Sequence, residues 1–88
     1  MSYDGRKDTR LNQSVPGMVY DADGNFLMRC IARDFSASGA HVTLSEDIPL
    51  PRYFLLSLMP DGSGRRLCSK VWQLALTAGV RFLQKEAA

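Results

Sequence analysis

Residues 15–44 decide the fold: VPGMVYDADGNFLMRCIARDFSASGAHVTL, three apolar runs separated by two clusters of turn-forming residues. The first cluster, residues 21–25, lies between the runs 15–20 and 26–32 and predicts a β-hairpin whose first strand begins near Gly17. In the second run every other residue is apolar, namely Phe26, Met28, Cys30 and Ala32. Residues 40–44 alternate in the same way, so this region predicts three short antiparallel strands with one face in the core.

The same pattern continues toward the C-terminus. Residues 52–59 place alternate apolar side chains on one face, and a turn at 60–64 leads into a strand over residues 65–76. A weaker break at 76–79 precedes a last strand around Val80 and Phe82, while two prolines make residues 48–51 a loop. Six short strands without a helical period predict an all-β fold. We favour a small six-stranded antiparallel barrel because closure removes exposed strand edges.

Composition restricts the class of protein. A chain of 88 residues forms one domain, and its 45% hydrophobic and 23% charged residues are ordinary for a globular protein. A net charge of +2 is too small to indicate duplex nucleic acid. No apolar run reaches the ~18 residues of a membrane span, and the polar N-terminus lacks the core of a signal peptide, so we expect a cytoplasmic protein. We divide the chain into a flexible arm (1–14), a barrel (15–84) and a tail (85–88).

Metal and catalytic chemistry are not expected. Cys30 and Cys68 lack metal-ligand spacing and are predicted to be free buried thiols, with a cross-strand disulfide as the alternative. His41 has no ligand partner at suitable spacing and is predicted to face solvent from a strand. No nucleophile has a histidine base nearby in the sequence, so we expect neither an enzyme nor a bound cofactor.

Two arginines in the arm, Arg6 and Arg10, have the pattern RxxxR. Each guanidinium can bind a phosphate or a guanine edge with its planar donors. A solvated charged tail is the alternative, and the spacing alone is weak because Arg29 and Arg33 share it. Those two lie in a predicted strand, where residues four apart are about 13 Å from each other. In a loop, Arg6 and Arg10 can converge on one ligand.

The turn after the second strand carries the pattern DxSxxG, with Asp34, Ser36 and Gly39. The Asp34 carboxylate suits the N1 and N2 donors of guanine, and Ser36 can bond to nearby backbone. We expect Gly39 either to adopt a positive φ or to let a ligand approach the main chain. A simple β-turn is the alternative.

The motifs of this chain, and the order in which they occur, resemble the PilZ domain family, a bacterial receptor module. The order is RxxxR, DxSxxG, Val71-Trp72 and Gly79-Val80-Arg81-Phe82. The resemblance covers nearly the whole chain and implies a β-barrel that binds cyclic di-GMP. It assigns ligand binding to Arg6, Arg10, Asp34, Ser36 and Gly39, and signalling to an unidentified downstream protein. Gly5 stands where many members have a further arginine, which leaves the number of bound ligands open.

Several other residues and functions stay open at this point. Trp72 faces the same way as Leu74, so we expect core packing, with a base-stacking platform as the alternative. Arg65 and Arg66 are expected at a solvated hairpin tip, and Arg81 is expected to point outward toward the ligand. The alternative function is a ligand-independent protein-interaction module that uses exposed Leu55 and Met59. Binding of single-stranded RNA would need outward aromatic residues, and no such run is apparent.

Overall fold

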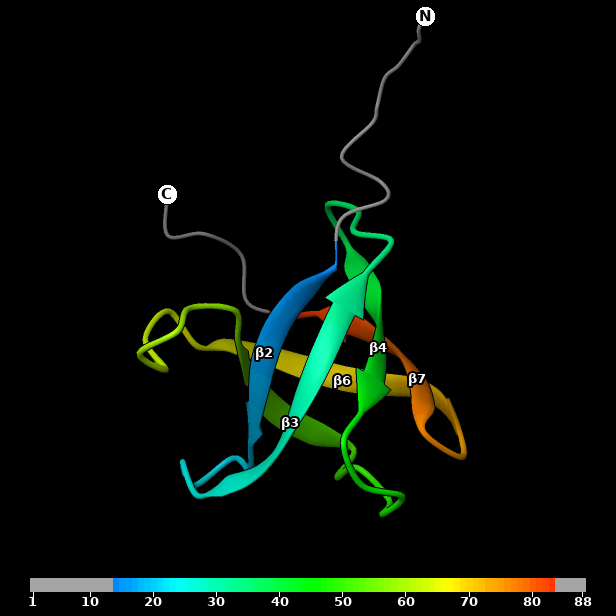
Figure 1. The fold of residues 1–88 in the computed structure, drawn as a ribbon, viewed down its shortest axis with the longest axis horizontal. Helices are drawn as coiled ribbons and strands as arrows, with labels where there is room; N and C mark the ends of the chain where they lie inside the picture. Colours follow the sequence, from blue (N-terminus) through cyan, green and yellow to red (C-terminus); the bar gives the residue numbers. More distant parts are fainter. Residues whose placement is uncertain (1–13, 84–88) are drawn as a thin grey trace, which may run out of the picture.

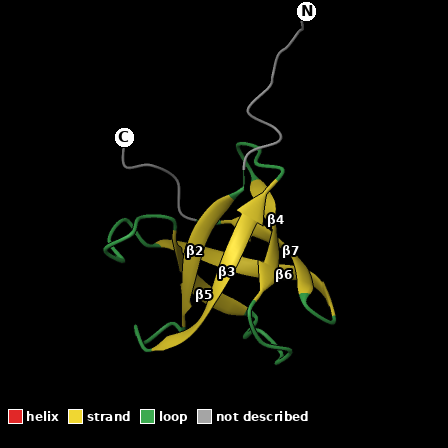
Figure 2. Cartoon of the chain, in the orientation of Figure 1, coloured by secondary structure: helices red, strands yellow, loops and turns green. Residues whose placement is uncertain are grey.

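The computed structural model describes residues 14–83 and forms a closed barrel of six antiparallel strands (Figure 1). The strands are β2 (Val15–Tyr20), β3 (Phe26–Arg33), β4 (Gly39–Leu44), β5 (Tyr53–Ser57), β6 (Arg66–Leu74) and β7 (Thr77–Phe82). Their order around the barrel is β2-β3-β4-β7-β6-β5, and pairing of β5 with β2 closes it. The predicted fold class is confirmed. Strands and loops make up the whole described region (Figure 2), and it holds no helix long and apolar enough to cross a membrane.

The hairpin of β2 and β3 forms where the turn cluster predicts it. Oδ1 of Asp21 accepts hydrogen bonds from the backbone N–H groups of Asp23 and Asn25, both at 2.9 Å. Hydrogen bonds from Asn25, backbone and side chain, hold the pKa of the Asp21 carboxyl below its ordinary value. Gly24 follows at φ 93°, a conformation that favours glycine. The turn is therefore closed by its own side chain. Strand β2 begins at Val15, two residues before the start that the sequence predicts at Gly17.

The hairpin of β6 and β7 turns earlier than predicted. Leu74 pairs with Thr77, so Ala75 and Leu76 make the turn, with Ala75 at φ 54°. The break expected at residues 76–79 is wrong, because Gly79 lies inside β7, where it faces Trp72 of β6. A glycine in this strand marks a close contact and not a turn.

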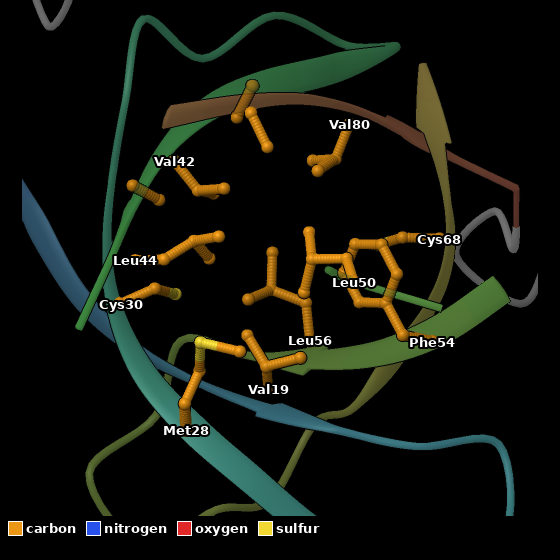
Figure 3. Close-up of a cluster of buried hydrophobic side chains, with 13 residues drawn as sticks. Val19, Met28, Cys30, Val42, Leu44, Leu50, Phe54, Leu56, Cys68 and Val80 are labelled. Carbon is orange, nitrogen blue, oxygen red and sulfur yellow. The ribbon is translucent and has the colours of Figure 1, made fainter. Parts of the chain in front are cut away.

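The core fills the barrel with side chains from all six strands and one loop (Figure 3). Its buried members are Val19, Met28, Cys30, Ala32, Ala40, Val42, Leu44, Leu50, Phe54, Leu56, Cys68, Ala78 and Val80. The predicted inner face of β3 is confirmed except at its first residue, because Phe26 is 52% exposed and packs edge-on against Tyr20, with 5.8 Å between ring centroids. Both cysteines are free and buried, as predicted. Burial raises the pKa of Cys30 to about 11 and of Cys68 to about 12.

A β-bulge in β6 changes which residues face outward. Lys70 pairs with Val80 and Trp72 with Gly79, so Val71 is an extra residue without a partner in β7. One extra residue moves every later side chain to the opposite face. Trp72 and Leu74 are consequently 43% and 73% exposed, and the expected core packing of Trp72 is wrong.

The arginines after the β5–β6 turn are held by aromatic rings. The guanidinium of Arg65 lies 3.7 Å from the ring centroid of Tyr20, and its Nε–H donates to the carbonyl of Gly62 at 3.0 Å. Arg66 lies over the ring of Phe82 at 4.9 Å. Arg65 is exposed beside the turn, as predicted, whereas Arg66 is half-buried, and both guanidinium groups make cation–π contacts that the sequence did not predict.

Candidate functional site

The loop between β3 and β4 brings Asp34, Ser36 and Gly39 together. The backbone N–H of Ser36 donates to the carbonyl of Gly39 at 2.9 Å. In return, Oγ of Ser36 accepts from the N–H groups of Ser38 and Gly39, both at 3.2 Å. The N–H of Phe82 donates to the carbonyl of Ser38 at 2.8 Å and ties the loop to β7. Ser36 therefore serves the loop's own backbone, and the loop is fixed at one end of the barrel.

Asp34 supplies the left-handed conformation that ends β3, with φ at 55°. Aspartate and asparagine tolerate this region better than other residues with a side chain, because their short polar groups bond locally. The side chain is 56% exposed, and its Oδ2 lies 3.2 Å from Nδ1 of His41, where an imidazole N–H can donate to it. The carboxylate is thus held on the outer face of the barrel.

A glycine is needed at position 39 because the backbone of β7 lies too close to leave room for a side chain. Positive φ among the described glycines occurs at Gly24, Gly62 and Gly64, so the first of the two alternatives for Gly39, a positive φ, is wrong. A Cβ at Gly39 would overlap the carbonyl oxygen of Val80 and lie 3.3 Å from Cα of Arg81. The close approach that glycine permits is therefore between two strands, and it sets the position of the loop relative to Arg81.

A row of outward residues crosses four strands beside this loop. Register pairs Arg33 with His41, His41 with Gly79, and Gly79 with Trp72. A Cβ at Gly79 would overlap the indole, so the ring of Trp72 lies across the glycine. The His41 and Trp72 rings meet edge-on, with centroids 5.7 Å apart. His41 faces solvent from its strand, as predicted.

These elements enclose an open hollow of about 260 Å³ on the outer wall, which we call the rim hollow. Besides Asp34, Ser36 and Gly39, its lining includes His41, Val71, Trp72 and Arg81. The outward direction expected for Arg81 is confirmed. The sequence prediction missed His41 as a lining residue, and for Trp72 it gave a base-stacking platform only as the alternative to core packing. The signal that could have found Trp72 was Gly79 within a strand pattern, since such a glycine marks close approach.

Arg6 and Arg10 lie outside the described residues, so their part in the site stays a prediction. The structure does place the start of β2, because Val15 pairs with Ala32 near the end of β3. Figure 1 shows β2 beginning at the end of the barrel that carries the β3–β4 loop. The described chain therefore enters the barrel at the end that carries the β3–β4 loop.

Chemically, the rim hollow offers an exposed carboxylate, an aromatic ring, an imidazole and a guanidinium. These groups suit a planar base with donors on one edge and an anionic group nearby. Within residues 14–83 no three His, Cys, Asp or Glu side chains are grouped to hold a metal ion.

Comparison with known proteins gives one match. A family model described as PilZ domain matches residues 4–88, which is nearly the whole chain. No curated protein and no solved structure matches.

Proposed function

Since the chain belongs to the PilZ domain family, known for binding cyclic di-GMP, we propose that it is a receptor for this dinucleotide. The observation that carries the proposal is the rim hollow. Asp34, Ser36 and Gly39 lie in one hydrogen-bonded loop there, beside an exposed tryptophan. The ligand would change the arm and the barrel surface and so signal to a partner protein.

Asp34 would read one guanine. Guanine presents two neighbouring donors, N1–H and N2–H, and a carboxylate accepts from both. His41 and the backbone conformation hold Asp34 on the outer face before any ligand arrives. Preorganisation of this kind reduces the side-chain entropy lost on binding.

Trp72 and Arg81 would complete the contact. The indole lies 43% exposed across Gly79, so a base can stack on its outer surface. Arg81 is an exposed guanidinium at the border of the same hollow, suited to a phosphate. The single tryptophan of the chain would therefore report binding through its fluorescence.

The arm would supply Arg6 and Arg10. Arg10 lies five positions before Val15, so the chain can place it at most about 17 Å from the start of β2. The two guanidinium groups would donate to guanine O6 and N7 or to phosphate. The arm would then close over a ligand held on the barrel wall.

Isothermal titration calorimetry with cyclic di-GMP tests the proposal. We expect Arg10→Ala and Asp34→Asn each to lower affinity about 5- to 150-fold, equivalent to about 1–3 kcal/mol. Asparagine keeps the left-handed backbone, but its NH2 group opposes a guanine donor. Arg29→Ala and Asp47→Asn are matched controls, since both side chains are exposed outside the rim hollow.

If the wild-type protein gives no heat at high ligand concentration, the receptor proposal fails. The barrel would then be a ligand-independent interaction module. Of the two residues expected to serve that role, Met59 is 51% exposed whereas Leu55 is half-buried.

A further inference from the structure

A second concave surface adjoins the rim hollow on the outer wall. It is a groove of about 650 Å³ lined by Arg52, Tyr53, Ser69, Lys70, Val71 and Arg81, and we call it the basic groove. The register places it across three strands, because Arg81 of β7 pairs with Ser69 of β6, which pairs with Tyr53 of β5. Val71 and Arg81 border both concavities.

The basic groove carries three cations and no carboxylate. Arg52, Lys70 and Arg81 form no ion pair within the described part of the chain, 14–83. The guanidinium of Arg52 lies 5.5 Å from the ring centroid of Tyr53, and the N–H of Lys70 donates to the carbonyl of Arg52 at 2.9 Å. Three uncompensated positive charges on paired strands favour an anionic occupant.

We propose that the basic groove binds an acidic segment of a partner protein, and that cyclic di-GMP weakens this binding. The second half rests on the proposed receptor function. Separate carboxylates can each meet one of the three cations in charge-assisted hydrogen bonds. Charge complementarity of this kind selects the partner and speeds association.

A peptide fits the groove better than a nucleic acid strand. Tyr53 and Trp72 face outward as single aromatic residues, and Arg52 occupies one side of the Tyr53 ring. Trp72 rests on Gly79 in the neighbouring hollow and is not among the residues that line the groove. The net charge of +2 is also small for backbone binding.

Arg81 supplies the coupling. A ligand phosphate in the rim hollow would neutralise this guanidinium and bring negative charge to the edge of the groove. An acidic segment then loses one of three cations and meets like charge. Coupling free energies between sites commonly change affinity about 5- to 150-fold, and they act equally in both directions.

The test uses the full chain and a fluorescein-labelled peptide of eight glutamates, followed by fluorescence anisotropy at low salt. We expect saturable binding that Lys70→Glu weakens about tenfold or more. Arg29→Glu, the same charge reversal outside the groove, should leave peptide affinity unchanged. Lys70→Gln should have an intermediate effect, and circular dichroism checks that each variant is folded.

Cyclic di-GMP added at saturation, verified by calorimetry, should reduce peptide affinity at least about fivefold, and Arg81→Gln should remove that reduction. Peptide affinity unaffected by Lys70→Glu, or tighter binding of an eight-residue oligothymidylate than of the peptide, overturns the groove assignment. Equal peptide affinity with and without bound ligand overturns the coupling. If calorimetry detects no heat on adding cyclic di-GMP, only the receptor function is refuted. The assignment of the groove is unaffected, because the peptide titrations that test it contain no cyclic di-GMP.

Discussion

Replacing Gly39 with alanine tests how the site loop is built. Gly39 pairs with Arg81, and an added Cβ would overlap the carbonyl oxygen of Val80. It would also lie 3.2 Å from the Val80 carbonyl carbon and 3.3 Å from Cα of Arg81. All three atoms are backbone of β7, so no side-chain rotation relieves the overlap. The strands must separate at the point where β4 begins.

The magnitude follows from overpacking and one strained hydrogen bond. Inserting a methyl group into a tightly packed region costs about 1–3 kcal/mol. Separation of the strands also weakens the bond from Phe82 N–H to the Ser38 carbonyl, worth about 0.5–1.5 kcal/mol. We therefore expect Gly39→Ala to lower the free energy of unfolding by about 2–4 kcal/mol. At about 4–8 °C per kcal/mol for a domain of this size, Tm falls by at least about 8 °C.

Gly79→Ala is the matched control, because the three atoms nearest to the same methyl group there all belong to the indole of Trp72. An exposed side chain can rotate away, so we expect a loss below about 1 kcal/mol together with a shift in tryptophan emission. Thermal and urea unfolding followed by circular dichroism measure both variants. A Tm for Gly39→Ala within about 2 °C of wild type, or a larger loss in Gly79→Ala, would refute the distinction between backbone and side-chain contact.

Two further predictions concern stability. Burial raises the pKa of Cys30 to about 11 and of Cys68 to about 12, from 9.0 in an exposed thiol, so the unfolded chain loses these protons first as pH rises. The stabilisation from these two buried thiols is fully present below pH 9, and the free energy of unfolding should fall between pH 9 and 11. In a Cys30→Ala, Cys68→Ala variant this fall with pH should be smaller. A fall of equal slope in the variant would contradict the burial argument. Arg65→Ala removes the contact over Tyr20 and should lower the free energy of unfolding by about 1–3 kcal/mol, measured by urea titration. Arg29→Ala should leave it nearly unchanged, and equal losses in the two variants would show that the cation–π contact contributes nothing.

The sequence predicts the barrel where the pattern is local. Alternation along β3 assigns its inner face from single residues, and the turn cluster at Asp21 identifies the first hairpin because its side chain closes the turn. The loop carrying Asp34 and Ser36 is also visible as a motif. These features depend on neighbours within a few positions, so the sequence carries them directly.

Other features depend on the neighbouring strand. The reason for Gly39 is the backbone of β7, more than 40 residues later, and nothing near Gly39 in the sequence encodes that approach. The bulge at Val71 likewise exists only relative to the register with β7. If the alternation is continued from Cys68 without recognising Val71 as an extra residue, Trp72 is assigned to the core. In the structure Trp72 lies outside it.

That extra residue accounts for both concavities on the outer wall. If Val71 paired with Gly79 in a regular ladder, Trp72 would pair with Ala78 and point into a barrel already filled by the core. With the extra residue, the indole covers Gly79 on the outside, and Val71 separates the rim hollow from the basic groove while bordering both. Bulges are common beside functional sites because they redirect side chains without changing the fold. In this barrel a binding surface therefore forms at Val71, where the strict alternation of β6 fails. Arg81, which pairs with Gly39, borders both the rim hollow and the basic groove and so connects the two.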